Sequence, residues 1–595
     1  MKMTFSLIFC VISLLFFNNL FGQINSFDNK YYGSTPLTIE NNFIKSLKKY
    51  NSPVIDFVEF NQSPIETTCF IQKLGTNEKI SEFKSTKKAL SHLEFETASK
   101  KYNSLFVQHN QKLSPSLVGF VNFNTLKTDG YYLRTAYKKI FVEVGAFNFD
   151  TLNRVNYSFH VLNNKIKSNE SGGLSSDSLF IFKEQNSKFF TTNLATSSST
   201  RKLSEFGADL NIRLFNTGLQ KNIDSLNKTQ DWNLRWLNSF VYSELKYWFE
   251  SDNKEDFYQN HYIDTTSTDD LFVYKPLTYS SKLELNKNYS ALKININGHL
   301  GYNGLLNKVS QNGIDSTYYV SNLFWGGGIQ NTNKYGLFYI GEFAFLRNQD
   351  AYNHSNHSIL FYYLPISKWR IDGKIESKKQ MPSYIENRFY SNHYKWKNQF
   401  GLVNYKSFDL TSSIIDSILV IKYSLTNLKN HIYFDYSASP KQFSAAININ
   451  RLTLYTNIQV KKFHITNYFI YSSITNNDIY RFPKIILGSR VCYTQYFKNN
   501  KIAVSPQISL NYLSSFQSYS YEPASGSFYL KDGYKKSGNY PFFDFSFEVK
   551  MSNAVIEIGC NHINKGLSGR NYFLTTSYPT PERSIYLKVI WSLVN

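Results

Sequence analysis

The chain has 595 residues, a formal net charge of +21 and 17% aromatic residues, among them 45 Tyr and 50 Phe. A mean hydropathy of -0.36 beside so many rings argues against an ordinary soluble fold and is typical of a barrel with apolar outer faces, a polar lumen and polar loops. The positive charge would attract anionic lipid or solutes, but the basic residues are spread along the sequence, which favours a generally lysine-rich composition and argues against a nucleic-acid partner.

The first 22 residues are predicted to be a secretory signal peptide. The range Phe5–Phe17 is apolar apart from two serines, and Gly22 is a suitable residue for cleavage. A membrane anchor is disfavoured because the apolar run is too short, and lipidation at Cys10 is disfavoured because the residues before it are large. Residues 23–88 follow, and their charged final part lacks strand alternation, so we expect a periplasmic extension there.

Residues 89–595 are predicted to form one all-β unit, an antiparallel transmembrane β-barrel. A stretch of about 18 apolar residues, which a membrane helix requires, does not occur after the signal peptide. Apolar and polar residues instead alternate with the two-residue period of a strand. A closed barrel leaves no unpaired backbone groups in lipid. Clear examples of the alternation are Leu292–Leu300, Ile502–Leu510, Phe543–Val549 and the terminal strand Ile585–Leu593.

The connections between the C-terminal strands alternate between short and long, which predicts the topology. Lys498–Asn500 and Met551–Asn553 are short links, whereas 514–541 and 564–584 are long. Outer-membrane barrels have short periplasmic turns and long outer loops, so we place the C-terminus in the periplasm. The length of the chain predicts about 16 strands, with roughly 14 to 18 compatible.

Two irregularities in the alternation predict local distortions of the sheet. Pro506 cannot donate a ladder hydrogen bond, so we expect a bulge or a position at the barrel rim. The apolar phase slips between Ile449 and Leu452. Such a slip predicts either a bulge or a tight turn.

Several short segments, in order along the chain, resemble the putative porin family of Bacteroidetes. The resemblance covers most of the chain after the signal peptide, although residues 200–430 match by pattern only. It implies an outer-membrane barrel and a pore for small solutes. The segments are Leu105–Pro115, Asn163–Leu174 with its Glu-x-Gly-Gly motif, YEPASGSFY at Tyr521–Tyr529, GNYPFFDFSF at Gly538–Phe547, NYFLTTSYP at Asn571–Pro579, and then Arg583 and Trp591.

Charged residues on the polar phase of the strands are candidates for the lining of a pore. Both signs are present, and facing charges of opposite sign create a transverse field across a hydrated constriction. A ring of about 16 strands is wide enough for water, whereas about eight would be packed shut. The same residues could instead pair with one another inside a filled barrel. The candidates are Lys293, Lys501, Asp544, Glu548, Lys550 and Lys588.

The favoured function is that of an outer-membrane porin that allows passive diffusion of small hydrophilic solutes, with a mild preference for anions if lysines line the pore. Membrane lipid and lipopolysaccharide would surround it, and a homo-oligomer is compatible with the sequence. The alternative is a non-conducting outer-membrane barrel that acts as a scaffold for secretion, adhesion or envelope assembly. A TonB-dependent transporter is disfavoured because residues 23–88 are too few for a full plug domain, and a hydrolase with side chains on the barrel rim is a third class.

The sequence contains no arrangement that predicts an enzyme, a cofactor or a metal centre. Gly-x-Ser-x-Gly, HExxH and phosphate-loop motifs are absent. His354 and His357 have a spacing that a metal could use, and Asp264–Asp270 could offer carboxylates to calcium. Ordinary polar loops explain both segments better. The cysteines outside the signal peptide, which show no CxxC pair and so predict no disulfide framework, are Cys69, Cys492 and Cys560.

Overall fold

The computed structural model describes residues 89–594 except 149–153, 184, 217–230, 253–255, 289–291, 334–335, 348–353, 367–368, 381, 416–417 and 568. The predicted signal peptide at residues 1–22 and the predicted extension at residues 23–88 therefore lie outside the described residues. The described residues all belong to the range 89–595, which is predicted to be the barrel.

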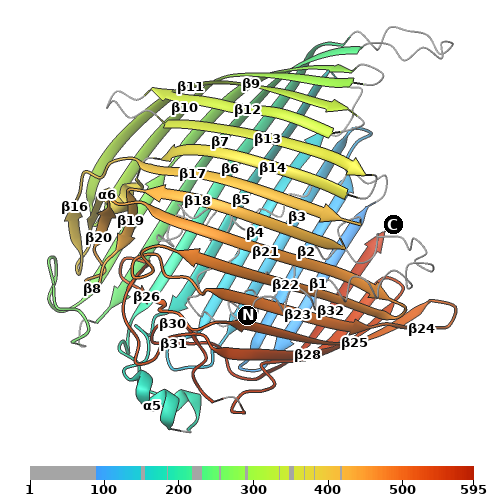
Figure 1. Ribbon diagram of the computed structural model, residues 1–595. Helices are drawn as coiled ribbons and strands as arrows, with labels where there is room; N and C mark the ends of the chain where they lie inside the picture. The colour runs from blue at the N-terminus through green and yellow to red at the C-terminus, as the bar shows by residue number, and fades with distance from the viewer. Residues whose placement is uncertain are drawn as a thin grey trace, which may run out of the picture.

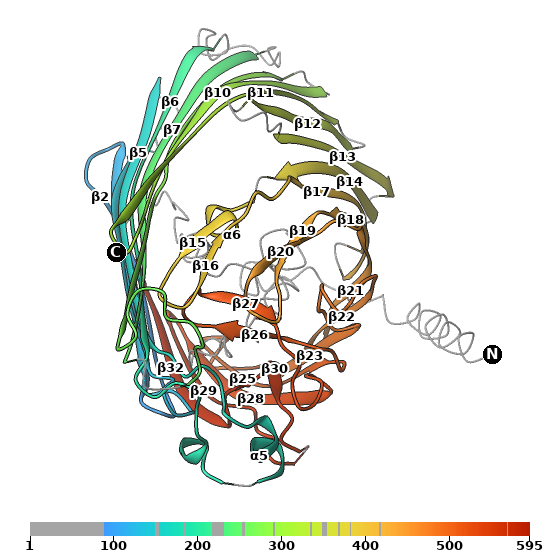
Figure 2. The same ribbon diagram turned by 90° about the vertical axis from the view of Figure 1, so that its left-hand side faces the viewer.

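One antiparallel sheet of 24 strands dominates the molecule (Figure 1). The first and last strands, β1 and β32, pair along the whole of Leu90–Ala98. Pairing among the described strands therefore continues round the sheet, and Figure 2 shows the strands surrounding a central space. The first twelve strands are β1 (Leu90–Ala98), β2 (Tyr102–Lys112), β3 (Leu117–Thr128), β4 (Tyr137–Asn148), β5 (Val155–Asn169), β6 (Ser198–Asn216), β7 (Asp231–Ser251), β8 (Thr268–Lys275), β9 (Leu277–Asn288), β10 (Leu292–Gln311), β11 (Ile314–Asn333) and β12 (Gly336–Arg347). The sheet continues with β13 (His354–Ile366), β14 (Trp369–Gln380), β17 (Val403–Ile414), β18 (Leu419–Lys429), β21 (Ile447–Val460), β22 (Phe463–Ile474), β23 (Ile485–Tyr493), β24 (Gln495–Phe497), β25 (Ile502–Leu513), β28 (Tyr540–Met551), β29 (Ala554–Asn561) and β32 (Ser584–Val594).

The predicted number of strands, about 16, is wrong. Strands β8 and β9 follow each other along one path between β7 and β10, and β24 continues β23 along β25. The 24 strands therefore occupy about 22 positions round the sheet. The estimate was too low because it rested on the length of the chain and allowed too many residues for loops, whereas turns such as Asn312–Gly313 between β10 and β11 are short.

The predicted alternation separates an apolar outer face from a polar inner face. On β28, Phe545 and Phe547 point outward and are 44% and 40% exposed, while Ser546 between them is buried. Trp591 on β32 also lies on the outer face and is exposed. Tyr586 on the same strand points inward and donates a hydrogen bond of 2.8 Å to Glu557. The sequence pattern therefore identified which side of these two C-terminal strands is apolar and faces outward.

The apolar outer surface ends abruptly on β5 to β7. On β5 the outward residues Val155, Tyr157, Phe159 and Val161 are exposed and apolar, and from Asn163 onward the exposed residues are polar. The neighbouring strands change at the same level, since Phe206 and Tyr242 are outward and apolar and Glu244 is charged. We call the apolar part the apolar band.

Connections at the two ends of the sheet differ in length, as the sequence predicted near the C-terminus. One end carries the turns at 498–501 and 552–553, and it also carries the last residues of β32. The other end carries long connections at 170–197, 381–402, 430–446, 514–539 and 562–583, and we call it the long-loop end. The helices in these connections are short, and none among the described residues is long and apolar enough to cross a membrane.

The long connections fold into the space inside the sheet and form an inner layer (Figure 2). A four-stranded sheet with the order β20, β19, β27, β26 lies at its centre. These connections contain α5 (Asp177–Phe182), η3 (Ser187–Phe189), α6 (Tyr384–Asn387), β15 (Arg388–Tyr390), β16 (Lys395–Lys397), β19 (His431–Phe434), β20 (Pro440–Phe443), β26 (Tyr519–Glu522), β27 (Ser527–Leu530), β30 (Phe573–Thr575) and β31 (Tyr578–Pro579).

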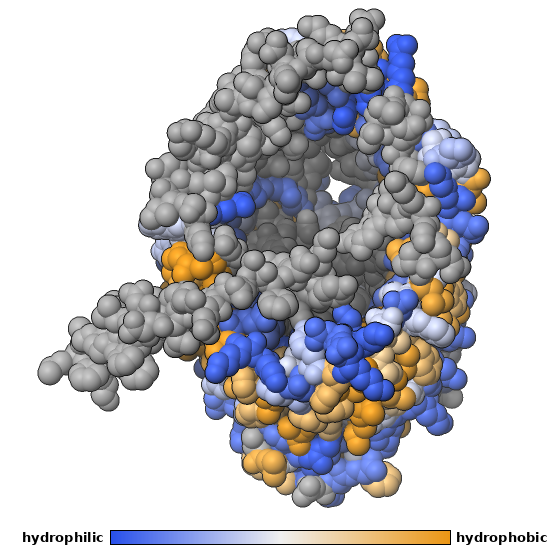
Figure 3. Space-filling view, turned by 90° about the vertical axis from the view of Figure 1, so that its right-hand side faces the viewer, coloured by the Kyte–Doolittle hydropathy of each residue, from blue (hydrophilic) through white to orange (hydrophobic). Residues whose placement is uncertain are grey.

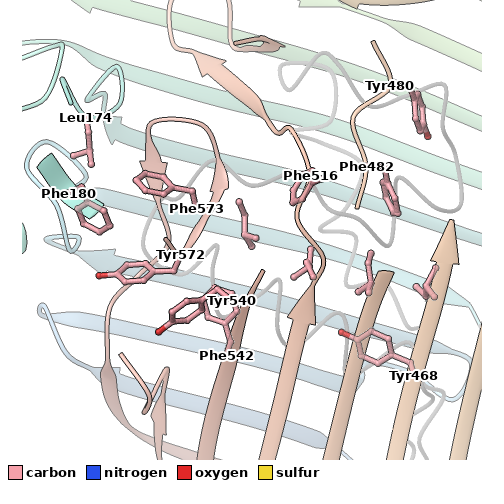
Figure 4. Packing of buried hydrophobic residues seen from close by; sticks show 14 of the residues in the cluster. Leu174, Phe180, Tyr468, Tyr480, Phe482, Phe516, Tyr540, Phe542, Tyr572 and Phe573 are labelled. Carbon is pink, nitrogen blue, oxygen red and sulfur yellow. The ribbon is translucent and has the colours of Figure 1, made fainter. Parts of the chain in front are cut away.

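An aromatic core holds the inner layer against the wall (Figure 4). Phe180 of α5 is fully buried, and its ring centroid lies 5.2 Å from that of Tyr572 and 5.3 Å from that of Phe573. Edge-to-face pairs of this kind stabilise beyond the area that they bury. Because inward residues near the long-loop end meet this core instead of water, the inner face of the wall is apolar there.

This core explains the slip of apolar phase that the sequence showed at Ile449–Leu452. The prediction of a bulge or tight turn is wrong, because β21 keeps an unbroken register with both neighbours. Ile447 and Ile449 point inward and are buried in the aromatic core, whereas the outward residues are apolar further along the strand.

Pro506 on β25 keeps its register with β28, and the ladder on its other side is interrupted between β23 and β24.

Candidate functional site

Four of the six predicted lining residues lie on the inner face of the C-terminal strands. Glu548 pairs across the sheet with Glu557, which in turn pairs with Lys588. Lys588 forms an ion pair of 2.7 Å with Glu94 of β1. This part of the wall therefore carries partly solvated charges of both signs. The other two inward candidates are Asp544, which accepts a hydrogen bond of 2.6 Å from the backbone N–H of His562, and Lys550.

The remaining two candidates occupy different places. Lys501 lies in the exposed turn between β24 and β25, at the end opposite the long loops. Lys293 lies on β10, where the structure describes the backbone pairing with Thr332 of β11. Figure 3 shows a hollow centre, and the described residues that are visible on its wall are mostly hydrophilic.

A second charged sector of the inner wall was missed by the sequence analysis. Three ion pairs lie on the inner face of β14, β17 and β18. The residues between them on these strands, such as Ile375 and Leu410, point outward. The acidic partners are about one-fifth exposed, which indicates contact with water inside the sheet. The alternation of these charged residues with apolar residues is visible in the sequence. However, residues 200–430 resemble the family by pattern only, so no matching segment indicated which strands pair and in which register. The pairs are Arg370 with Asp372 at 2.6 Å, Lys374 with Glu376 at 2.6 Å and Lys422 with Asp409 at 3.6 Å.

One hairpin of the inner layer reaches from one side of the wall to another. Strands β26 and β27, Tyr519–Leu530, belong to the connection between β25 and β28, and we call them the cross-lumen hairpin. Arg201 of β6 donates a hydrogen bond of 2.5 Å to the Tyr521 hydroxyl, and Tyr247 of β7 donates one to the carbonyl of Pro523. The hairpin is therefore joined to β25 and β28 through the chain, and hydrogen bonds hold its far end to β6 and β7.

The segments that carry the family resemblance meet at this hairpin. Tyr578 donates a hydrogen bond of 3.1 Å to the backbone oxygen of Tyr521. The backbone N–H of Leu174 donates one of 2.7 Å to the oxygen of Ser577. Gly173 has a φ of 82°, and a Cβ there would lie 2.9 Å from the Cβ of Ser577. The Glu-x-Gly-Gly loop, YEPASGSFY and NYFLTTSYP, remote in the sequence, thus build one junction.

Two buried carboxyl groups lie at this junction. Glu170 forms an ion pair of 3.8 Å with Arg201 and accepts a hydrogen bond of 2.5 Å from Ser199. Glu522 accepts hydrogen bonds of 2.7 Å from the Tyr258 hydroxyl and 3.0 Å from the N–H of Ala524. Burial raises the pKa of the Glu522 carboxyl to about 7. Burial also raises the pKa of Glu170, against the opposing effect of Arg201.

The residues considered for metal binding join loops to one another. Asp264 closes its own turn by accepting a hydrogen bond of 2.7 Å from the N–H of Thr266. Asp270 accepts hydrogen bonds from the N–H of Asn392 and, at 2.9 Å, from the side chain of Asn312. Among the described residues, no group of three His, Cys, Asp or Glu side chains could hold a metal ion. His354 and His357 lie on β13, while Cys492 and Cys560 are free thiols and Cys69 lies outside the described residues.

A family model described as putative porin matches residues 49–595. The chain belongs to the putative porin family. This match confirms the resemblance found in the sequence and covers the whole sheet and inner layer. A search of the curated proteins gives no match.

Solved structures of similar fold include receptors and transporters. The ferric enterobactin receptor PfeA from Pseudomonas aeruginosa has a TM-score of 0.61 and 9% identity, and the match covers 86% of this chain and 82% of that chain. The copper transporter OprC gives 0.60 and 9%, with 85% and 80% covered. The FrpB iron transporter from Neisseria meningitidis gives 0.58 and 10%, with 85% and 82% covered. At such low identity the likeness shows the fold alone, an all-β fold built on one large antiparallel sheet.

Proposed function

We propose that this member of the putative porin family spans the outer membrane as a closed barrel and lets small hydrophilic solutes diffuse through its lumen. The observation that carries the proposal is the contrast between the two faces of one wall. The outer face presents the apolar band, and the inner face presents partly solvated ion pairs such as Lys374 with Glu376. Hydrocarbon outside and water inside account for both faces.

The inner layer sets the size limit in this proposal. A barrel of about 22 strands has a lumen far wider than a small solute needs. The cross-lumen hairpin and its neighbours fill part of that width at the long-loop end, so solutes pass beside them along the charged wall. By the topology of outer-membrane barrels, the long-loop end faces outward and the C-terminus lies in the periplasm.

Conductance of the refolded mature protein in planar bilayers tests this function. We expect discrete current steps in the absence of any energy source, and a reversal potential in a salt gradient that reports which ion sign the lumen prefers. Flat traces from a protein that is correctly folded, as judged by a heat-dependent shift in gel mobility, would contradict the proposal.

Flat traces would favour the second candidate, a non-conducting outer-membrane barrel that serves as a scaffold. A specific observation supports keeping it, because the inner layer has its own buried aromatic core around Phe180 and Tyr572. A core of that kind holds the loops in one arrangement, as a barrel with a partner-binding outer end would require.

Conductance is also expected to depend on pH through Glu522. Because its folded pKa of about 7 lies above the usual value of about 4.3, the docked hairpin binds this proton more tightly than the released one. Docking is therefore strongest in acid and weakens as the pH rises from about 4.3 to about 7. We expect open-state noise and mean conductance to increase between about pH 5 and pH 8 in bilayer recordings.

The variant Glu522→Gln isolates this effect because it keeps a neutral side chain at every pH. Its hairpin remains docked, so most of the pH dependence should vanish. Asp532→Asn, on an exposed residue of the same connection that pairs with Arg481 at 2.7 Å, is the matched control and should retain the wild-type profile. Equal pH dependence in Glu522→Gln and the wild type would exclude this role for Glu522.

A further inference from the structure

Lysines that are scattered in the sequence gather on the outer wall of β3 to β7. Their strand positions place them on the same phase as the apolar outward residues Val121, Ile140 and Val161. They follow directly after the apolar band, toward the long-loop end. We call this group the lysine belt, and its members are Lys127, Lys138, Lys165, Lys167, Lys202 and Lys246.

Cross-strand register brings these lysines directly opposite one another. Lys138 pairs with Lys127 of β3 on one side and with Lys167 of β5 on the other. Lys202 pairs with Lys165 of β5 and with Lys246 of β7. Like charges directly opposite in an antiparallel sheet repel each other and destabilise it. Four such contacts in one patch therefore call for an anion that lies against them.

The protein itself supplies little compensating charge. Lys246 forms an ion pair of 3.1 Å with Glu244, which also binds Lys275 at 2.8 Å. Among the described residues, the other five lysines of the belt have no carboxylate within ion-pair distance. The inner wall differs, since its cations Arg370, Lys374 and Lys422 each have an acidic partner. A lysine-rich composition alone does not account for that difference.

We propose that the lysine belt binds the phosphate groups of the lipid leaflet that surrounds the barrel at its long-loop end. The belt lies where the apolar band ends, which is the level of headgroups if hydrocarbon covers the band. Lysine stems can lie along apolar surface while their ammonium groups reach phosphate. Each lysine near an anionic surface then contributes favourable binding free energy. The inference rests on the proposed membrane location, and it assigns lipid A phosphates as the ligand because the long-loop end faces outward in that proposal.

Binding of lipid A to the detergent-solubilised full-length mature protein tests the assignment. The probes are lipid A and its dephosphorylated form, counted per protein by native mass spectrometry. We expect lipid A to be retained and dephosphorylated lipid A to be lost. The central substitution Lys138→Gln should weaken retention about fivefold. Exchange of Lys127, Lys138, Lys165, Lys167 and Lys202 for Gln should reduce it to the level of the dephosphorylated probe.

A matched set of substitutions separates the belt from total charge. Five exposed lysines in turns and loops, Lys461, Lys498, Lys501, Lys535 and Lys536, are exchanged for Gln and should leave retention unchanged. Equal losses in the two sets, or equal retention of the two probes by the wild type, would overturn the proposal. Bilayer conductance of the belt variant should equal that of the wild type, so failure here and failure of the pore proposal give different results.

Discussion

Shortening the cross-lumen hairpin is expected to raise the single-channel conductance several-fold. Tyr519 and Leu530 are opposite one another at the base of the hairpin, so residues 520–529 can be replaced by Asn-Gly, which forms a two-residue turn between paired strands. The change removes the anchors at Tyr521 and Pro523 and leaves the base in place. Tyr519 keeps its hydrogen bond of 2.7 Å to the oxygen of Ile479.

The increase follows from where the hairpin lies. It extends from the wall at β25 and β28 to the wall at β6 and β7, inside a sheet of about 22 strand positions. In the proposed pore the hairpin narrows the path near the long-loop end, so its removal should widen the path there, and the resistance of a wide pore is concentrated at its narrowest part. The measurement is the distribution of current steps in planar bilayers, together with the uptake rate of neutral sugars of increasing size into vesicles.

A turn at the other end provides the control for this experiment. Replacing Ser552–Asn553 between β28 and β29 by Asn-Gly changes a loop of the same strand without touching the lumen, and conductance should stay as in the wild type. A shortened hairpin that leaves the current steps unchanged in a folded barrel would show that the constriction lies elsewhere.

The sequence predicted the two faces of the wall because the two-residue period depends only on local residues. It placed Phe545 outward and Glu548 inward correctly, and it identified the short and long connections near the C-terminus. The number of strands could not be predicted from the sequence, because it depends on how many residues each loop uses. The inner layer could not be predicted either, because loops that fold inward are held by contacts between residues hundreds of positions apart, such as Arg201 with Tyr521.

Cross-strand register accounts for the other difference between sequence and structure. Lys127, Lys138 and Lys167 are dispersed along the chain, a pattern that by itself indicates only a lysine-rich composition. Pairing of β3, β4 and β5 brings the three side by side. Charge clustering in a sheet becomes visible only when the register is known, which is why the lysine belt could not be predicted.

Removal of the Arg201 side chain is expected to destabilise the junction of the inner layer strongly. Arg201→Met leaves the Glu170 carboxyl buried without its nearest cation and removes the hydrogen bond that holds Tyr521. Breaking a buried pair by deleting one partner typically costs about 3–5 kcal/mol, because the remaining charge stays unsolvated. We expect the free energy of unfolding, measured by denaturant titration in detergent, to fall by about 3 kcal/mol.

The double variant decides whether the charge or the packing is responsible. In Arg201→Met/Glu170→Gln both charges are absent, so most of the lost stability should return, since replacing both partners of a buried pair is often nearly neutral. Thr200→Val alters the preceding residue, which is uncharged and lies on the outer face, and should change stability by less than about 0.5 kcal/mol. If the double variant were as unstable as Arg201→Met alone, the ring packing of Arg201 over Tyr247, and not its pairing with Glu170, would hold the hairpin to the wall.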